Sequence, residues 1–568
     1  MPATIATPDE IRPNLADRFG MVLAWVAASR ARAAAVLLLV ALACFLPGQA
    51  SIPAVDRDEA RYAQATTQML ETGDFVDIRL HDQPRHYQPA GIYWLQALAV
   101  RLTGSAVPAE IWAYRLPSLI GACLVVLLTY WAAEPLGDRR IAVIAGLMMA
   151  AALLLNVEAR LAKTDAVLNA TILACQAVLF RLYLRGKSTA PPLGWAIGFW
   201  VAAGLGVLVK GPILPLIVGL TIAAASILAR DWRWLSGLRP LIGLPIALLI
   251  ALPWYVAIWF ATDGAFYAKA IGYSVTEKIT SGMQSHGAPP GYYLLLFWVT
   301  SWPIGAVAAS ALPSLWRDRS SADIRFLAAW VLPVWIVYEL IATKLPHYVL
   351  PLYPAIALAA ASAFAGGRID ADRAWVRLLF ILAALGPVAF VTGAAGGFLA
   401  LEGSLPPPIV PLAAAVAGFS ILALRLIQLR KLMSGWLVLA AIVAPLTYSS
   451  LFGVLAPRLE SLWISPRLAT ASAEVAGCAD PAVISVGHGE ASLIFAVGTD
   501  IRFGGTEEAA AFLAGGACRA AIVEQEAEEA FSPELAKAAV ASGPVRRVEG
   551  LSIANGRRLD FGVYGSPR

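Results

Sequence analysis

The chain has 568 residues, of which 59% are hydrophobic and only 14% are charged, and its formal net charge is +5. Ordinary soluble domains carry about 25% charged residues, so this composition excludes a disordered chain, a coiled coil and a simple soluble enzyme. It predicts a mainly α, polytopic membrane protein with modest water-exposed parts. Five cysteines and five histidines are too few for a disulfide scaffold or a metal cluster.

The N-terminal segment, residues 1–32, is charged and does not resemble a cleavable signal peptide. Acidic and basic residues are interspersed through it, and no small-residue cleavage site follows a short apolar core. We expect this segment to lie in the cytoplasm. The first long apolar run, from Ala33 to about Leu46, predicts a retained first membrane helix.

Apolar runs then recur at the length that a membrane helix needs. With about 20 residues per span, we predict about 13 transmembrane helices within a membrane domain of residues 33–456. The runs lie at 33–48, 111–133, 141–157, 166–184, 194–209, 211–229, 240–260, 292–312, 325–341, 350–366, 376–400, 408–428 and 434–455. A weaker run covers residues 91–103.

Basic residues indicate the orientation, because cytoplasmic loops are enriched in Lys and Arg. If the N-terminus is cytoplasmic, every second loop is basic, from Arg139 and Arg140 through to Arg430 and Lys431. This alternation holds only if residues 91–103 do not cross the membrane. We expect that segment to lie on or dip into the outer face, and an odd number of spans places the C-terminus outside.

The last part of the chain, residues 457–568, differs in composition from the membrane domain. The strand-like run AVISVGHGEASLIFAVGTDIRF precedes helical stretches rich in Ala and Glu, and a strand-like pair surrounds Asn555 and Gly556. This pattern predicts a small α/β domain of about 110 residues, near the usual domain size. Cys478 and Cys518 lie in this tail and would pair in an oxidising compartment.

Acidic, basic and tyrosine side chains gather on the predicted outer face, whereas the inner loops carry mostly Arg. Ionisable groups at a membrane boundary point to function, so the simplest interpretation is a one-sided site at the outer water–lipid boundary. The segments that contribute are the first outer loop at 49–110, Lys163 to Asp165, Lys210, the loop at 261–291, and Lys344 to Tyr348.

This mixture of side chains suits a reaction in which a phosphate leaves. One carboxylate can accept the proton of an attacking hydroxyl, and Lys and Arg can stabilise the departing phosphate. The chain has no P-loop, no GxGxxG fingerprint and no HExxH motif, which argues against a nucleotide donor. A lipid-linked phosphate donor fits, because its tail enters between helices while its head meets the polar loop. No nucleic-acid partner is expected.

Six motifs, in order over roughly residues 50–360, carry a family resemblance. They read DRDEARYAQATTQMLETGDF, PRHYQPAGIYWLQA, RLAKTDAVL, LVKGP, HGAPPGYY and KLPHYVLPLYP. They resemble motifs of the C-type glycosyltransferase superfamily (GT-C), above all the bacterial aminoarabinose lipid A transferases (ArnT-like) and the related dolichyl-phosphate-mannose-protein mannosyltransferases. The resemblance implies thirteen spans, a periplasmic C-terminal domain and a polyprenyl-phosphate-sugar donor.

The resemblance also implies roles for single residues. Asp58 matches the catalytic acid or base and Asp165 the second acidic residue. His286 matches a position that helps to hold zinc in the aminoarabinose branch. Two positions depart from the family, because Gln88 replaces the lysine that meets the lipid phosphate and Tyr87 replaces an acidic zinc position. A zinc site at His286 is therefore doubtful, and the need for a divalent metal is left open. The residues expected to meet the donor and its phosphate are Glu59, Arg61, Tyr62, Arg85, Gln88, Lys210, Lys344 and Tyr348.

These residues also have purely structural interpretations. Asp58 and Glu59 could cap and solubilise a loop helix, and Asp165 could be a helix N-cap. Lys210, before Gly-Pro, could be an interfacial anchor. His347 is interpreted as a packing or surface residue rather than a ligand.

Three functions compete. The first is an inner-membrane glycosyltransferase that moves a hexosyl or pentosyl group from a polyprenyl-phosphate donor to lipid A, an envelope glycan or a protein at the periplasmic face, with Asp58 as general base. The second is a transporter or flippase for a lipid-linked or anionic substrate, although transporters usually place ionisable groups near the midplane and in repeated halves. The third is a non-catalytic assembly subunit, which Gln88 and Tyr87 allow but Asp58, Asp165 and Lys344 argue against.

Overall fold

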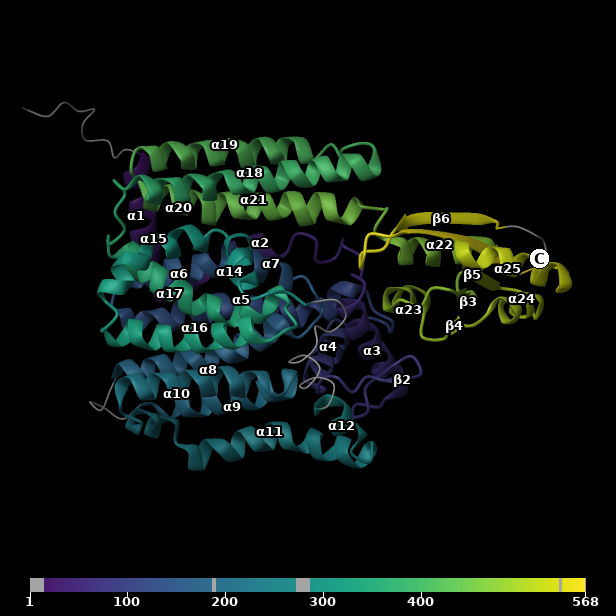
Figure 1. Ribbon diagram of the computed structural model, residues 1–568, viewed down its shortest axis with the longest axis horizontal. Coiled ribbons are helices and arrows are strands. Elements are labelled where there is room, and N and C mark those ends of the chain that lie inside the picture. Colours follow the sequence, from purple (N-terminus) through teal and green to yellow (C-terminus); the bar gives the residue numbers. More distant parts are fainter. Residues whose placement is uncertain (1–14, 186–190, 272–286, 541–543, 567–568) are drawn as a thin grey trace, which may run out of the picture.

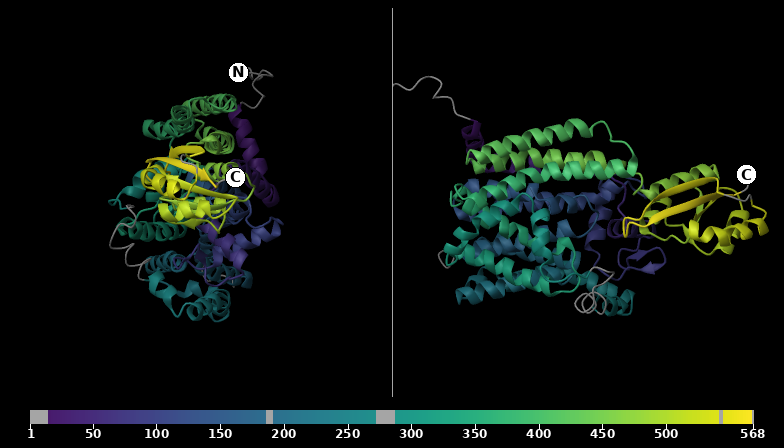
Figure 2. Two further views of the ribbon diagram at one scale, coloured as in Figure 1. Left: turned by 90° about the vertical axis from the view of Figure 1, so that its right-hand side faces the viewer. Right: turned by 45° about the horizontal axis from the view of Figure 1, so that its top comes forward.

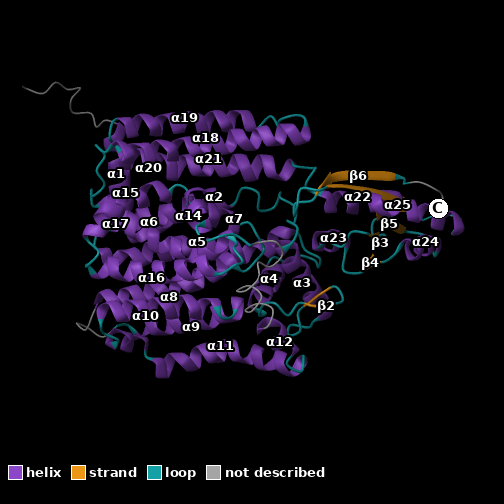
Figure 3. Ribbon diagram, in the orientation of Figure 1, coloured by secondary structure: helices purple, strands orange, loops and turns teal. Residues whose placement is uncertain are grey.

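The computed structural model describes residues 15–185, 191–271, 287–540 and 544–566. The chain forms a bundle of long helices that lie side by side, and a smaller domain projects from one end of the bundle (Figure 1). The rotated views in Figure 2 show the same separation. Among the residues that the structure describes, strands are confined to the smaller domain and one short hairpin near it (Figure 3). This arrangement confirms the predicted mainly α membrane protein with a small C-terminal α/β domain.

The bundle is built from helices of the first and second parts of the chain. Those of the first part are α1 (Leu15–Ala27), α2 (Arg30–Phe45), α5 (Ile111–Ala133), α6 (Arg139–Ala151), α7 (Leu153–Glu158), α8 (Asp165–Arg185), α9 (Leu193–Lys210), α10 (Ile213–Ala229), α11 (Pro240–Ala261) and α12 (Ala265–Ile271). Those of the second part are α14 (Tyr292–Thr300), α15 (Ile304–Arg317), α16 (Ala322–Leu340), the 3-10 helix Pro346–Leu352, α17 (Tyr353–Ala365), α18 (Ala374–Glu402), α19 (Ile409–Gln428), α20 (Leu432–Val438) and α21 (Ala444–Tyr448).

All thirteen predicted apolar runs are helical, but fewer of them are uniform membrane spans. Within the described ranges, eight helices are long and apolar enough to cross a membrane, or up to ten if each bent pair is one span. The bent pairs are α1 with α2, at 116°, and α14 with α15, at 117°. Three other runs give the interrupted pair α6 and α7, the shorter α10, and α16, which carries Asp323, Arg325 and Glu339. The chain is therefore a multi-pass membrane protein whose spans are less regular than the sequence predicts.

The buried share of a helix shows whether it lies at the edge of the bundle or inside it. Only 22% of the apolar stretch of α11 is buried, and Leu249 on this helix is 77% exposed. Such an apolar outer face is expected where lipid replaces water. The apolar stretch of α8 is 67% buried, because α8 packs against α5, α9 and α10. The helix that begins with Asp165 thus lies inside the bundle.

The first loop forms a compact layer at the end of the bundle that faces the smaller domain (Figure 1). Its elements are α3 (Asp58–Thr72), β1 (Arg79–Leu80), β2 (Gln83–Pro84) and α4 (Gly91–Leu102). A helix of 12 residues, such as α4, is about 18 Å long at 1.5 Å per residue, too short to cross about 30 Å of hydrocarbon. Residues 91–103 therefore do not form a span, as the alternation of basic loops predicts.

The C-terminal domain is a five-stranded mixed sheet with helices on both faces. Its strand order is β4-β3-β5-β7-β6, with β3 parallel to both β4 and β5, and β7 antiparallel to β5 and β6. The hairpin around Asn555 and Gly556 joins β6 to β7, as predicted. The elements are α22 (Ile464–Ala476), β3 (Ala482–Val486), α23 (Ala491–Val497), β4 (Arg502–Phe503), α24 (Thr506–Ala514), β5 (Arg519–Glu524), α25 (Gln525–Lys537), β6 (Arg546–Leu551) and β7 (Arg558–Gly565).

Alternating side chains explain why this sheet is covered on both faces. On β5, Ala520 and Ile522 pack in the cluster that contains Leu468 of α22. Ala521 and Val523 pack in the opposite cluster with α24 and α25. Successive strand residues point to opposite faces, so a continuous apolar run predicts two covered faces. Cys478 and Cys518 form a disulfide within this domain.

The chain joins the C-terminal domain to the end of the helical bundle, and hydrogen bonds attach the domain to the first loop as well. Thr499 Oγ1 accepts from Gln64 Nε2 at 2.7 Å and donates to Glu71 Oε2 at 2.8 Å. Both partners lie on α3. His81 Nε2 lies 2.9 Å from the Ile501 carbonyl oxygen. Helix α3 is therefore held between the helical bundle and the domain.

Candidate active site

A cluster of buried charges lies where the turn between α7 and α8 meets the end of α9. Lys210 Nζ donates to Asp165 Oδ1 at 2.6 Å, and Lys163 Nζ lies 3.5 Å from Asp165 Oδ2. The side chains are buried, so each charge requires a partner. Asp165 is also the first residue of α8, where the helix dipole favours a carboxylate. The structure thus brings the predicted Asp165 and Lys210 together with Lys163, which had only been placed on the same outer face.

Two further residues of this cluster, Glu158 and His347, were not predicted as site residues. Lys163 Nζ lies 3.0 Å from Glu158 Oε1. The His347 ring lies between the acids, with Nδ1 3.8 Å from Glu158 Oε1 and Nε2 3.7 Å from Asp165 Oδ1. His347 is therefore a packed residue, as one of its two interpretations had it, and not a surface residue. Glu158 directly follows the apolar run 141–157, and an acid at the end of such a run is the signal that could have found it.

Asp58 is the exposed carboxylate beside this buried cluster. Its side chain is 57% exposed, and its Oδ1 lies 4.0 Å from Arg61 Nη1. Burial and the nearby Glu158 and Asp165 have the larger effects on the pKa of Lys163, and Asp58 adds a smaller one, so Asp58 lies within electrostatic range of the cluster. Asp58 begins α3, where the helix dipole again favours a carboxylate. It therefore combines contact with solvent and electrostatic contact with the cluster, the combination that a proton acceptor for an incoming substrate needs.

Arg85 of the first loop contacts two tyrosines, Tyr62 and Tyr93. Its Nε donates to Tyr93 Oη at 2.8 Å, and its guanidinium lies 4.8 Å from the centre of the Tyr62 ring. Burial raises the pKa of Tyr62 well above its ordinary value, so this phenol stays neutral. Arg85 and Tyr62, both expected to meet the donor, thus lie together in the first loop.

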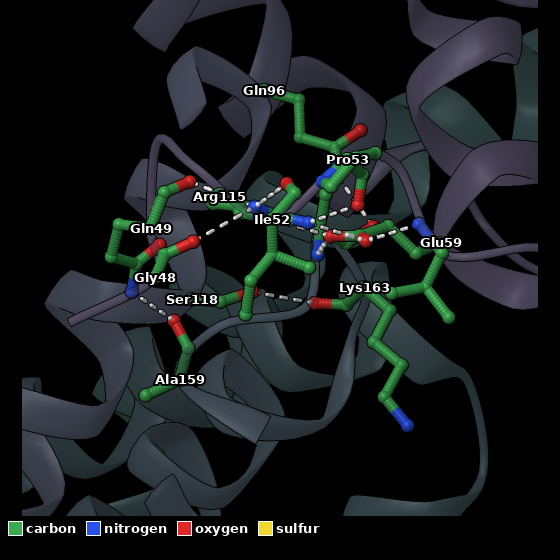
Figure 4. A network of polar contacts seen from close by, with 12 residues as sticks. Gly48, Gln49, Ile52, Pro53, Glu59, Gln96, Arg115, Ser118, Ala159 and Lys163 are labelled. Carbon is green, nitrogen blue, oxygen red and sulfur yellow. Dashed lines mark hydrogen bonds and ion pairs between the residues drawn. The ribbon is translucent and has the colours of Figure 1, made fainter. Parts of the chain in front are cut away.

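Glu59 was expected to meet the donor, but it is paired with Arg115 inside the protein. Both of its carboxylate oxygens accept from Arg115, from Nε and Nη2, each at 2.8 Å (Figure 4). Oε2 also accepts from the Val55 N–H at 2.9 Å, and Oε1 from the Ala162 N–H at 2.8 Å. With its acceptors used inside the protein, Glu59 is a brace between the first loop and α5. Its predicted role at the donor is corrected accordingly.

The brace fixes both chain segments that carry the candidate acids. Arg115 Nη1 donates to the carbonyls of Gln49 and Ile52, each at 2.8 Å. Ser118 Oγ donates to the carbonyl of Lys163 at 3.1 Å, while the Lys163 side chain extends away from this network (Figure 4). The segments before Asp58 and before Asp165 are therefore both tied to α5.

Lys344 is a second correction. Its Nζ donates to the carbonyls of Tyr338, Glu339 and Ile341 at 3.3, 2.9 and 2.7 Å. These carbonyls belong to the last turn of α16, where helix carbonyls lack partners within the helix. All three ammonium protons are used, so Lys344 caps α16 rather than facing a phosphate. The adjacent Tyr348 does reach the cluster, because its ring centre lies 5.1 Å from that of His347.

Of the positions implied for zinc and for the lipid phosphate, the structure describes Tyr87 and Gln88 but not His286. Gln88 Oε1 is buried and has no hydrogen-bond partner within the described ranges, and Tyr87 has the Lys269 ammonium 4.7 Å above its ring. In the part of the chain that the structure describes, no group of three His, Cys, Asp or Glu side chains is placed to hold a metal ion.

Comparison with known proteins agrees with the fold. The family model of dolichyl-phosphate-mannose-protein mannosyltransferases matches residues 34–265. An undecaprenyl phosphate-alpha-4-amino-4-deoxy-L-arabinose arabinosyl transferase from Pseudomonas aeruginosa is 30% identical over 53% of this chain and 54% of its own. One from Pectobacterium carotovorum is 26% identical over 57% and 58%. The matched part of the chain thus spans about half the length of these curated relatives.

Two solved structures share the whole architecture. Crystal structures of ArnT from Cupriavidus metallidurans, in the apo state and bound to undecaprenyl phosphate, both give a TM-score of 0.69. The apo structure is 19% identical and aligns over 96% of this chain and 98% of its own; the bound one is 20% identical over 95% and 98%. These likenesses show that the chain has the fold of the ArnT structures, in agreement with the resemblance that the six motifs carry.

Proposed function

We propose that the chain is a glycosyltransferase that moves a sugar from a polyprenyl-phosphate donor to an envelope acceptor at the periplasmic face of the bacterial inner membrane. The observation that carries this proposal is the position of Asp58. It is open to solvent at the end of the bundle, and it lies within electrostatic range of the buried Lys163, which belongs to the cluster between α7, α8 and α9. An acceptor arriving from water and a donor held in lipid can meet at such a boundary.

In the proposed reaction, Asp58 accepts the proton of an acceptor hydroxyl as its oxygen attacks the anomeric carbon. The bond between that carbon and the phosphate oxygen breaks, and polyprenyl phosphate leaves with the bonding electrons. Arg85, Lys163 and Lys210 are the cations for the leaving phosphate. Asp165 and His347 hold the two lysines in place, and Glu158 balances their charge.

The proposal has support beyond the site. The curated relatives are named as transferases that use an undecaprenyl-phosphate aminoarabinose. A structure of similar fold binds undecaprenyl phosphate. For this chain, 4-amino-4-deoxy-L-arabinose is the first sugar to test, and lipid A, envelope glycans and proteins are the acceptors. The need for a divalent metal stays open, and no step of the proposed reaction uses one.

The test is the Asp58→Asn variant in detergent, with donor consumption and acceptor glycosylation as readouts. Loss of a general base lowers the rate by about 10²- to 10⁴-fold, while folding and membrane insertion should be unchanged. The matched control is Asp82→Asn, because Asp82 lies in the same loop with its side chain 85% exposed. Turnover of Asp58→Asn at the wild-type rate would disprove the assignment.

The same assay separates the alternative transporter function. An enzyme consumes the donor in detergent, where no sealed compartment exists. A transporter or flippase would leave the donor unchanged under those conditions and would move it only across a vesicle membrane. Mass spectrometry of envelope lipids and glycans, with and without the gene, would then identify the sugar and its attachment point.

A further inference from the structure

Helix α1 runs across the direction of the long helices, at the end of the bundle opposite the C-terminal domain (Figure 1). The angle between α1 and α2, where the first span is predicted, is 116°. Because α2 enters the bundle, α1 lies near the plane of the membrane surface. The proposed orientation places this end of the bundle at the cytoplasmic leaflet. The proposed reaction uses no residue of α1, and the family match begins after it, at residue 34.

Helix α1 is apolar on two opposite sides. One side packs in the core of the bundle through Leu23 and Val26. The other side carries Met21, Val22 and Trp25, which are 51%, 58% and 57% exposed. Residues three and four positions apart share a face of a helix, so these three side chains form one continuous surface, the α1 patch. An exposed apolar face on a helix that lies along a membrane surface is typical of helices that insert between lipid headgroups.

Hydrogen bonds to other elements hold α1 in this position. Ser434 Oγ of α20 donates to the Ala16 carbonyl at 3.1 Å. At the other end, Arg139 Nη1 of α6 donates to the Ala27 carbonyl at 2.8 Å. The last carbonyls of a helix lack partners within it, so this contact caps α1. The α1 patch is therefore a preformed surface of the bundle.

Arginine side chains lie at both ends of the α1 patch. Arg18 is exposed and lies about one turn before Met21, on the same side of α1. The Arg32 guanidinium lies over the Trp25 ring, with Cζ 4.1 Å from the ring centre, and its Nη1 donates to the Trp25 carbonyl at 2.7 Å. Helix α1 and the first turn of α2 carry three arginines and one acid, Asp17. This excess of positive charge favours an anionic membrane surface.

We propose that the α1 patch and its two flanking arginines bind anionic phospholipids of the cytoplasmic leaflet. Arg18 and Arg32 each contact a lipid phosphate, since a guanidinium donates two parallel hydrogen bonds to phosphate oxygens. Arg30 is left out of this role because it pairs with Glu134 at 2.8 Å. The apolar side chains of the patch contact the acyl chains, and tryptophan favours this boundary. The inference goes beyond the proposed reaction and uses only the proposed orientation of the chain.

The test measures lipids bound to the full chain in detergent, by native mass spectrometry. The probes are phosphatidylglycerol, which is anionic, and phosphatidylcholine, which has no net charge, with the same acyl chains. The double variant Arg18→Gln with Arg32→Gln should weaken phosphatidylglycerol binding about tenfold or more, because each basic residue near an anionic leaflet adds to the affinity. Its binding of phosphatidylcholine should be unchanged. The matched control is Arg319→Gln, because Arg319 also donates to a tryptophan carbonyl, that of Trp316 at 2.8 Å, but in the loop between α15 and α16.

Two further variants cover the folding of α1 and its apolar side. If the double variant unfolds at a lower temperature, because Arg32 also contacts the Trp25 carbonyl, the single variant Arg18→Gln repeats the measurement. Val22→Asp places a carboxylate on the α1 patch, outside the core of the bundle. It should weaken the binding of both lipids, because acyl chains do not accommodate a charge.

Tighter binding of phosphatidylglycerol than of phosphatidylcholine, lost in the double variant and kept in Arg319→Gln, supports the inference. Four results would overturn it: equal binding of the two lipids by the wild type, no effect of the double variant, no effect of Val22→Asp, or an equal loss in Arg319→Gln, which would assign the binding to basic loops in general. Because no turnover is measured, this result and that for Asp58→Asn can each fail without affecting the other.

Discussion

The Arg115 guanidinium and the Glu59 carboxylate form a two-point ion pair inside the protein, with both N–O distances at 2.8 Å and both side chains 1% exposed. Breaking such a pair leaves a lone buried charge, which costs about 3–5 kcal/mol. We therefore expect Glu59→Gln to lower the unfolding temperature in detergent markedly. The double variant Glu59→Gln with Arg115→Met should recover part of that loss. A Glu59→Gln protein of normal stability that binds donor poorly would instead support a contact between Glu59 and the donor.

Because Lys344 caps α16, we expect its replacement to lower stability without weakening donor binding. Lys344→Met removes three hydrogen bonds to the last turn of α16, and the loss of charged hydrogen bonds should cost about 1.5–3 kcal/mol. The unfolding temperature should fall, while the KM for the donor, measured on folded protein, should stay at the wild-type value. A raised donor KM at unchanged stability would show that Lys344 contacts the phosphate.

Asp165 and Lys210 should behave as one unit in catalysis. Because their atoms lie 2.6 Å apart, either Asp165→Asn or Lys210→Met removes the same arrangement. Each single variant should lower kcat about 10²-fold, as for other groups that stabilise a leaving charge. The double variant should be no slower than the slower single variant, which a double-mutant cycle on kcat measures. Multiplied losses would show that the two residues act independently.

The stability of the C-terminal domain should depend on pH through His488. Burial lowers the pKa of His488 from its ordinary value of 6.5. As pH falls, the unfolded chain therefore binds a proton before the folded domain does, so the folded state loses stability below about pH 6.5 and regains it as pH rises. His488→Gln should flatten the fall of the unfolding temperature between about pH 7 and about pH 5. An equally steep fall in this variant would assign the effect to other groups.

The helices were predictable because a bilayer demands apolar runs of a fixed length, and hydropathy alone reveals them. Hydropathy does not report how a run bends, so the sharp angle between α1 and α2 was not foreseen. The small sheet was predictable from its strand-like runs and the turn at Asn555 and Gly556.

Side-chain partners were harder to predict than elements. Glu59 and Arg115 are 56 positions apart, and nothing in the local sequence indicates that they pair. Lys344 follows the end of α16, and whether such a lysine caps carbonyls or meets a ligand depends on the path of the chain there. The motif resemblance pointed to Asp58 and Asp165, and Glu158 could have been found at the end of its apolar run. His347 joins these acids only because a distant segment folds against them.

The hydrogen bonds from Thr499 to both Gln64 and Glu71 have an engineering consequence. The domain contacts α3 at two positions. A chimera that exchanges only the C-terminal domain with that of a relative would therefore lose the partners of Gln64 and Glu71. A graft that keeps Asp58, the proposed catalytic carboxylate, in place must therefore transfer α3 and the domain together.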